Sequence, residues 1–428
     1  MTELSDLTGA EAIAAVRDKD ASVTEIATAC LDRIRTREPV VHAFAHHDPL
    51  LVRQRAEELD RGLTSSPLRG MTLAIKDLMD TADYPTEFGS RIYAGRRPVR
   101  DAALVTRLNS AGALVMGKTV TTEFALFEPG PTTNPWDAAH TPGGSSSGSA
   151  AATADGMVAA AIGTQTAGSV IRPAAFCGVV GFKPSFGALD RAGLKVMSPS
   201  LDTLGVFART VRDIELVYRC ARVVSPRRNR PERRAGPVRI GFVRTSHWEM
   251  ADPTVMHGLE ALAEELAVAG FEVVETTLPP SFADLVPAHA AIMEREVAET
   301  LHDELARDPH LLSDSTKEVL RRGSAQPREA YVRARTTASE CRSLLSRAFG
   351  DLDAILTPAV TGEAPRGLSY TGDPIFCRAW TLLGTPTISL PLLAGPSGLP
   401  IGVQFVGHPG EDHSLLKVAS AVLRGTQH

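Results

Sequence analysis

The chain has 428 residues, of which 43% are hydrophobic and 22% are charged, and its formal net charge is −5. This is an ordinary globular balance without a basic excess, so neither nucleic acid nor an anionic membrane is an expected partner. The length fits one large domain or two modest ones, and without an apolar stretch of 18 residues no transmembrane helix is expected.

The first 65 residues have the pattern of N-terminal helices. Ser22 and Glu25 form the capping-box pair that starts a helix, and Ile26, Cys30 and Ile34 follow at helical spacing. The segment before them lacks the basic start and apolar core of a signal peptide. The five cysteines are widely spaced and odd in number, which argues against a disulfide framework. Both observations favour a cytoplasmic protein.

Residues 66–220 alternate short apolar runs with helical segments. Buried strands are expected at 71–75, 113–116 and 157–162, and helices at 102–110 and 149–155. A segment rich in Pro, Gly, Thr and Ser, residues 129–148, is expected to be a loop. This alternation is typical of an α/β layered fold.

Residues 221–350 begin with an Arg-rich stretch, residues 221–236, whose prolines favour a solvated connector over a basic nucleic-acid patch. A helical excursion follows, with strands at 238–244 and 271–278 and helices at 252–270 and within 282–348. Residues 351–428 return to strands. We expect a strand at 353–359, a hairpin of 386–393 with 400–407, and a last helix at 413–423.

Two segments match known motifs only literally. Gly112–Thr119 matches the phosphate-binding pattern GxxxxGK[ST], but its four inner residues are apolar and a strand occupies the place of the required loop. Gly144–Gly148 matches the nucleophile-elbow pattern GxSxG around Ser146, but no strand directly precedes it and no downstream histidine has a catalytic context. We therefore expect neither a nucleotide site nor an α/β-hydrolase.

Three other features together indicate a catalytic site. Lys76 ends an apolar run, and alone it would be read as a strand-end lysine paired with an acid. Thr141–Ala152 brings several hydroxyls together on a glycine-rich backbone, and alone it would be read as a linker. In Gly163–Ser185, small residues precede Ser169 and a helix is expected after it, which can aim backbone N–H groups at an oxyanion.

These segments resemble the amidase signature family over nearly the whole chain. The resemblance extends from AIKD through PGGSSSGSAAA and GTQTAGSVIRPAAFCGVVGFKPSFG to GTPTISLP and GLPIGVQFVG. It implies a single large α/β domain, residues 1–428, with a mixed, mostly parallel sheet between helices. Within it, 1–65 would be N-terminal helices, 66–220 the catalytic core, 221–350 a helical excursion and 351–428 a return to the sheet.

The resemblance also assigns roles to residues. It makes Ser169 the nucleophile, Ser145, 24 positions earlier and usually on a cis peptide bond, the intermediary, and Lys76 the base. The oxyanion hole would be formed by backbone groups of Thr166, Ala167, Gly168 and Ser169. Ser146 would brace Lys76 or its loop, and Asp77 would either do the same or be merely structural. The chain departs from the commonest pattern, GTDTGGS, at Gln165 and Ala167.

The chemistry requires Lys76 to be unprotonated. A lysine at its ordinary pKa is protonated at neutral pH and cannot accept a proton, whereas burial lowers that pKa. A neutral Lys76 would take a proton from Ser145, which takes one from Ser169, and the proton would then pass to the leaving amine. No metal and no organic cofactor is expected.

The substrate is expected to be a small amide. Arg172, three residues after the nucleophile, would hold a substrate carboxylate if it faces the pocket, and would otherwise form a structural ion pair. The main alternative function is the glutaminase subunit of a tRNA-dependent amidotransferase, which needs a partner protein. A catalytically silent binding protein is a third reading, which the intact Lys76, Ser145 and Ser169 oppose. A homodimer is compatible with the sequence.

Overall fold

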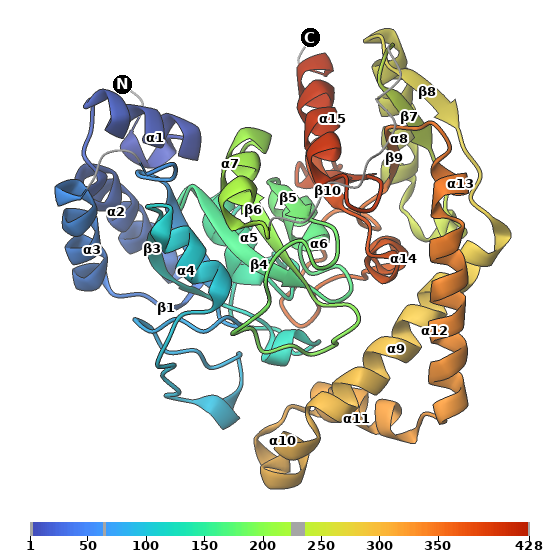
Figure 1. Ribbon diagram of the computed structural model, residues 1–428, viewed down its shortest axis with the longest axis horizontal. Helices are drawn as coiled ribbons and strands as arrows, with labels where there is room; N and C mark the ends of the chain where they lie inside the picture. The colour runs from blue at the N-terminus through green and yellow to red at the C-terminus, as the bar shows by residue number, and fades with distance from the viewer. Residues whose placement is uncertain (1–2, 63–65, 224–235, 427–428) are drawn as a thin grey trace.

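The computed structural model describes residues 3–62, 66–223 and 236–426. In this part of the chain, one 11-stranded sheet runs through the molecule in the order β1-β3-β2-β4-β6-β5-β10-β11-β9-β7-β8. Helices pack along it, from α1–α3 beside one end to α8 and α13 beside the other (Figure 1). The expected single-domain α/β fold with a mixed sheet is confirmed.

The strands are β1 (Phe44–His46), β2 (Thr72–Lys76), β3 (Leu114–Thr119), β4 (Ala160–Gln165), β5 (Val180–Lys183), β6 (Thr203–Ala208), β7 (Arg239–Phe242), β8 (Glu272–Glu275), β9 (Ala354–Pro358), β10 (Thr387–Ala394) and β11 (Pro400–Val406). The α-helices are α1 (Gly9–Asp18), α2 (Val23–Val41), α3 (Pro49–Arg61), α4 (Ala103–Ser110), α5 (Ser147–Ala154), α6 (Ile171–Cys177), α7 (Val211–Ala221), α8 (Pro253–Val268), α9 (Leu285–Thr300), α10 (His302–Arg307), α11 (Asp314–Ala325), α12 (Arg328–Ser343), α13 (Leu345–Phe349), α14 (Ile375–Leu383) and α15 (Asp412–Gly425).

The sheet combines two kinds of strand pairing. Strands β3, β2 and β4 pair in parallel, and so do β9, β7 and β8. Between these groups, β4, β6, β5, β10, β11 and β9 pair antiparallel, including the expected hairpin of β10 and β11. The expected predominance of parallel strands therefore holds inside each group but not in the centre. There β6 follows β5, and β11 follows β10, through connections without an α-helix, which antiparallel pairing allows.

The strands near the predicted site are displaced or longer than expected. β2 ends on Lys76 itself, and β3 continues beyond Met116 to Thr119. The GKT end of the phosphate-loop pattern is therefore strand, which confirms that it is no nucleotide loop. β4 starts at Ala160 and reaches Gln165 because Thr164 and Gln165 still pair with β6. This extension brings Thr164 into the site described below.

The N-terminal helices follow the expected pattern. Ser22 accepts a hydrogen bond from the Glu25 N–H, and the Glu25 carboxylate accepts one from the Ser22 N–H, so the capping box is confirmed. Ile26, Cys30 and Ile34 are buried in one core cluster with Ala74 of β2, Met116 of β3 and small residues of α5. The helices thus support the face of the sheet that carries α5.

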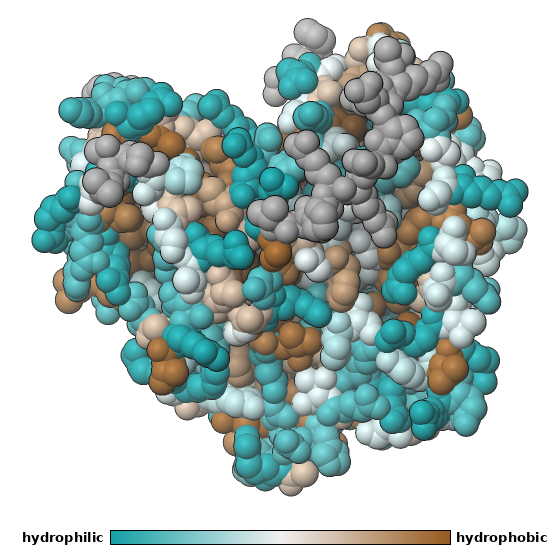
Figure 2. All heavy atoms as spheres, viewed as in Figure 1, coloured by the Kyte–Doolittle hydropathy of each residue, from teal (hydrophilic) through white to brown (hydrophobic). Residues whose placement is uncertain are grey.

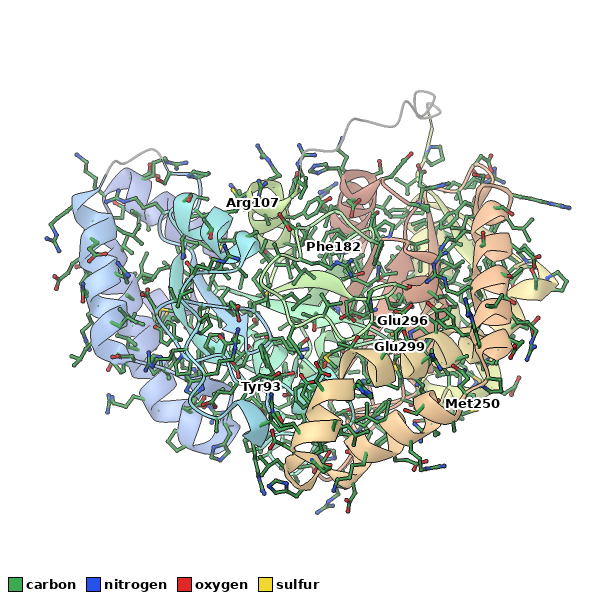
Figure 3. The ribbon with its side chains drawn as sticks, turned by 60° about the horizontal axis from the view of Figure 1, so that its bottom comes forward. Tyr93, Arg107, Phe182, Met250, Glu296 and Glu299 are labelled. Carbon is green, nitrogen blue, oxygen red and sulfur yellow. The ribbon has the colours of Figure 1, made fainter. Side chains whose placement is uncertain are left out.

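Helices α9–α11 contact residues 66–220 through three glutamates. Glu123, from the core, accepts hydrogen bonds from Ser313 and Thr316 at the start of α11. Glu296 on α9 accepts from Ser198, and Glu304 on α10 accepts from Tyr93. Figure 3 labels one residue from each of these pairs, Glu296 and Tyr93. A buried or partly buried carboxylate that accepts hydrogen bonds from hydroxyl groups holds the donor residues in place. They fix α9–α11 relative to the core loops.

Several further expectations concern the surface and the cysteines. All five cysteines are free thiols, as expected. The Arg-rich stretch lies almost wholly outside the described residues, so both readings of it stay open. None of the described helices combines the length and the apolar character needed to cross a membrane. On the face in Figure 2, hydrophilic side chains predominate and hydrophobic ones form small separate groups.

Candidate active site

Lys76 is the centre of the site. It is the last residue of β2, all five residues of which are buried, and its own side chain is fully inaccessible. Its Nζ lies 2.8 Å from Ser145 Oγ, 3.0 Å from Ser146 Oγ and 2.8 Å from Thr164 Oγ1. Among the described residues, no carboxylate is close enough to form an ion pair with it. The amine is therefore surrounded by hydroxyl groups alone.

This environment favours the neutral amine. Burial holds the pKa of Lys76 well below its ordinary value, although the more distant Asp202 opposes the effect. Three hydroxyls suit either protonation state of the nitrogen. An ammonium group donates three hydrogen bonds, whereas a neutral amine donates two and accepts one from a hydroxyl. A proton can thus move between Lys76 and a serine without loss of a hydrogen bond.

Ser145 and Ser146 come from the end of the predicted loop, immediately before α5. The Gly144–Ser145 peptide bond is cis. Gly143 has φ of 79°, and a Cβ there would lie 2.9 Å from the Pro173 Cα, so the loop is packed tightly on α6. Ser146 Oγ also donates to the Thr164 carbonyl at 3.2 Å. Ser146 thus contacts both Lys76 and the backbone of β4, and no strand directly precedes it.

Thr166–Ser169 form a short irregular segment between β4 and α6. The carbonyls of its first three residues are all occupied: Thr166 O lies 2.8 Å from His289 Nε2, Ala167 O accepts from Thr381 Oγ1 at 2.7 Å, and Gly168 O accepts from the Arg172 N–H at 2.9 Å. By contrast, the four N–H groups of this segment donate to no group of the described chain. Unused donors on a braced backbone are what an oxyanion hole requires.

Gln165, the first departure from the family pattern GTDTGGS, bonds to the backbone at the start of α6. Its side-chain oxygen accepts from the N–H groups of Val170 at 2.8 Å and Ile171 at 3.0 Å, and its amide nitrogen donates to Thr381 Oγ1 at 2.9 Å. The N–H groups at the start of α6 are therefore used within the protein. The N–H groups that stay available lie before the helix, in the segment 166–169.

Asp202 braces the same segment from the other side. Thr166 Oγ1 donates to Asp202 Oδ1 at 2.6 Å, while Asp202 Oδ2 accepts from the Met197 and Ser198 N–H groups at 2.6 and 3.1 Å. Burial raises the pKa of this carboxyl. Ser198 in turn donates to Glu296 on α9. The helical excursion is thus connected to the oxyanion segment through a continuous chain of hydrogen bonds.

Ser169 is buried but still reachable, with 6% of its surface exposed. Within residues 3–62, 66–223 and 236–426, its hydroxyl forms no hydrogen bond, and in particular none with Ser145. The connection between their segments is Arg172, in the first turn of α6, which donates to the Gly144 carbonyl at 2.7 Å. The structure therefore brings Lys76, Ser145 and Ser146 into contact and leaves the Ser169 hydroxyl unengaged.

The two remaining predicted residues have other partners. Arg172 donates from its two terminal nitrogens to the carbonyls of Gly144 and Gly372, and burial lowers its pKa to about 10. These contacts favour a structural role, through main-chain carbonyls rather than an ion pair. Asp77 accepts from Lys118 Nζ at 2.9 Å and from the Glu87 N–H at 3.0 Å. Its carboxylate forms no hydrogen bond with Lys76 Nζ. These contacts fit the alternative that Asp77 has only a structural role.

Four residues around the site were not foreseen from the sequence. Thr164 lies inside the signature segment, five residues before Ser169, and its hydroxyl was a usable signal. His289, Thr381 and Arg378 come from α9 and α14, where nothing local distinguishes them. Among the described residues, no three His, Cys, Asp or Glu side chains cluster as ligands for a metal ion.

Comparison with known proteins extends these observations. The family model "Amidase" matches residues 25–416. A glutamyl-tRNA(Gln) amidotransferase subunit from Chloroflexus aggregans is 34% identical over 483 aligned positions, which cover 100% of this chain and 98% of that protein. The alignment is longer than the chain, so this relative contains segments that the chain lacks.

Solved structures agree with the family match. A structure described as an amidase superposes with a TM-score of 0.90 at 29% identity and covers 98% of this chain and 99% of its own. A peptide amidase in complex with chymostatin superposes with a TM-score of 0.85 at 30% identity and covers 99% of this chain and 98% of its own. The chain thus belongs to the amidase family and is an enzyme that hydrolyses amides.

Proposed function

We propose that this enzyme cleaves a small carboxamide through an acyl-enzyme on Ser169, with Ser145 as the relay and Lys76 as the base. The main support is the environment of Lys76, an amine with three hydroxyl partners and no accessible surface. A structural lysine buried at this depth would be expected to donate to a carboxylate or to main-chain carbonyls, as Lys118 and Lys183 do. Lys76 instead has the partners of a proton acceptor.

The reaction has two halves. Ser169 Oγ attacks the amide carbon while its proton passes to Ser145 and the Ser145 proton passes to Lys76. N–H groups of the segment 166–169 stabilise the resulting oxyanion. The proton then returns to the departing nitrogen, which leaves as ammonia or an amine. Water releases the acyl group by the same path and restores both hydroxyls and the neutral amine.

The second candidate is the glutaminase subunit of a tRNA-dependent amidotransferase. Curated relatives from Chloroflexus aggregans and Salinispora arenicola, each 34% identical, support it. The glutamine side chain is itself a carboxamide, so the same residues would perform the hydrolysis and a partner protein would receive the ammonia. The stand-alone reading has its support in the solved amidase structures, at 29% and 30% identity.

A panel of small amides, glutamine included, tests the proposal with the purified full-length chain. The wild type should release ammonia from at least one amide, and Ser169→Ala should reduce this by several orders of magnitude. A fluorophosphonate probe, which reacts with activated serines, should label the peptide that contains Ser169. Retained activity in Ser169→Ala, or labelling at another serine, would refute the assignment.

The two candidates differ in how activity depends on a partner. A stand-alone amidase should turn over its substrate alone, at a rate that added partner proteins do not change. A glutaminase subunit should prefer glutamine and should be stimulated by the remaining subunits of an amidotransferase. A homodimer and a cytoplasmic location stay predictions, which size-exclusion chromatography with light scattering and cell fractionation would test.

A further inference from the structure

Arg378 lies on the face of α14 that packs on the oxyanion segment. A Cβ at Gly168 would lie 2.9 Å from Pro374 Cβ and 3.2 Å from Cys377 Cβ, and Thr381 donates to the Ala167 carbonyl. Positions 374, 377, 378 and 381 share one side of a helix because they are three or four residues apart. Arg378 is thus next to the backbone that carries Ser169.

Exposure distinguishes Arg378 from the other residues on this face. Pro374, Cys377 and Thr381 are buried, whereas Arg378 is partly exposed. Ala167 and Ser169 also keep a small exposed surface, 8% and 6%. Arg378 therefore combines an accessible part with a position on the helix face that packs against the segment of Ala167 and Ser169.

The protein does not neutralise the charge of Arg378. Its Nη1 lies 3.2 Å from His289 Nδ1. Since Thr166 O can only accept, His289 Nε2 carries the ring proton and Nδ1 accepts from the arginine. Burial lowers the pKa of His289 to about 3, so the ring is neutral. The contact orients the guanidinium without balancing its charge.

Among the described residues, no nearby acidic group forms an ion pair with the Arg378 guanidinium. In the described chain no carboxylate lies within ion-pair distance of Arg378. Asp373 and Glu294 are near enough to act on its charge, but Glu294 is bound to Arg322 at 2.8 Å. Arg172 adds a second positive charge nearby, and both of its terminal nitrogens donate to main-chain carbonyls. Asp373 is the remaining competitor for Arg378.

We propose that Arg378 binds a carboxylate of the substrate, which makes the preferred substrates small amides that carry a free carboxylate. The proposal rests on the proposed function and moves the role expected of Arg172 to Arg378. A guanidinium with one donor on His289 keeps further donors that can bind both oxygens of a carboxylate. The neutral His289 holds the group beside the oxyanion segment while leaving its charge for the substrate.

The test compares a charged amide with a neutral one of the same length. Succinamate and butyramide should be assayed with the wild type, Arg378→Gln and Arg378→Lys. The kcat/KM ratio of succinamate to butyramide should fall about 10- to 100-fold in Arg378→Gln, the range for a lost hydrogen bond to a charged group, and less in Arg378→Lys. The loss should appear mainly in KM for succinamate.

Two further variants separate recognition from folding. Arg342→Gln is the control, because Arg342 is a more exposed arginine that also contacts α14, where it donates to the carbonyl of Leu382. It should leave the substrate ratio unchanged. Asp373→Asn removes the competing carboxylate and should lower KM for succinamate. Binding of succinate, measured by calorimetry, should weaken in Arg378→Gln by the same factor as the substrate ratio.

A failure of the Arg378 assignment can be distinguished from a failure of the proposed function. If the wild type hydrolyses amides through Ser169 but the ratio and succinate binding are the same in Arg378→Gln, the proposed function stands and the assignment of Arg378 falls. Equal losses for both amides would likewise overturn it, because they would indicate a purely structural arginine. If no amide is hydrolysed and Ser169 is not labelled, the proposed function itself fails.

Discussion

Lys76 and Lys118 lie on adjacent parallel strands, and both are fully buried. Lys76 pairs in register with Thr119, and Lys118 with Ile75, so the two lysines point to opposite faces of the sheet. Lys76 meets three hydroxyls, whereas Lys118 meets the Asp77 carboxylate, Thr86 Oγ1 and the Pro85 carbonyl. Similar burial thus produces two different kinds of lysine.

The difference lies in whether a carboxylate is in direct contact with the amine. Burial lowers the pKa of both amines, but at Lys118 the adjacent Asp77 opposes the effect. Lys118 is therefore an ion-pair partner that fixes the 85–87 loop, and Lys76 is available as a base.

Burial alone does not identify a catalytic lysine. Lys183 is also fully buried, and in the described chain no carboxylate lies within ion-pair distance of it, but its Nζ donates to the carbonyls of Pro184 and Thr385. The partners of Lys76 are instead hydroxyls, which carry a proton.

The largest effect should come from removal of the base. Lys76→Ala should lower kcat about 10²–10⁴-fold, the usual contribution of a general base, while the fold is retained. Steady-state ammonia release together with circular dichroism would measure both. Lys417→Ala, at an exposed position of α15, serves as a control and should behave as the wild type. An active Lys76→Ala would remove the distinction between the two buried lysines.

Lys118 should show the opposite pattern, with a loss of stability first. Lys118→Met leaves Asp77 as an unpaired buried carboxylate and should lower the free energy of unfolding by about 3–5 kcal/mol. Urea unfolding would measure this. The double variant Lys118→Met/Asp77→Asn should recover most of the loss. If the double variant is as unstable as the single one, the ion pair is not what Lys118 contributes.

A smaller effect is expected from His289, which orients the Thr166 carbonyl. His289→Leu should lower kcat about 10- to 100-fold with little change in KM, because a displaced oxyanion segment impairs the transition state more than substrate binding. His289→Gln keeps an N–H donor and should recover part of the rate. The acid limb of the pH profile should stay in place, since His289 is neutral throughout the working range. A shift of the acid limb in the variant would instead indicate that His289 titrates during the reaction.

The smallest effect is a change in how stability depends on pH. The folded-state pKa of Lys76 is depressed, so below its unfolded value of about 10.5 the unfolded chain binds a proton that the folded chain does not. This group therefore makes wild-type stability fall as pH decreases from about 10.5 towards the folded-state pKa. In Lys76→Met this contribution disappears. Unfolding free energies of both proteins across that range should diverge as pH falls, and parallel curves would contradict a depressed pKa.

Much of the fold was predictable because local signals determine it. The capping box at Ser22, the hairpin of β10 and β11, and most helices follow from spacing and turn residues. The central antiparallel strands were not predictable as such, since β6 lies between β4 and β5 in the sheet, and β5 also pairs with β10 far along the chain. The ends of β3 and β4 also depend on partners in the sheet rather than on their own sequence.

The candidate site divides in the same way. Lys76, Ser145 and Ser146 lie in contiguous motifs, and Lys76 contacts both serines, but among the described residues no hydrogen bond joins Ser145 to Ser169. Their catalytic roles, and that of Ser169, stay predictions. The positions of His289, Thr381 and Arg378 at the site could not be predicted, because they depend only on the packing of α9 and α14 on residues 166–169. The partners of Arg172 were equally hidden, since any main-chain carbonyl can accept from an arginine.

The braces on the oxyanion segment come from late in the chain. Thr381 and Arg378 lie in α14, so a ribosome has made most of the polypeptide before these residues emerge. A nascent chain that already contains Lys76, Ser145 and Ser169 would still lack the hydrogen bond that holds the Ala167 carbonyl. Hydrolytic competence is thereby tied to completion of synthesis, and fragments truncated before α14 should be inert even where their strands assemble.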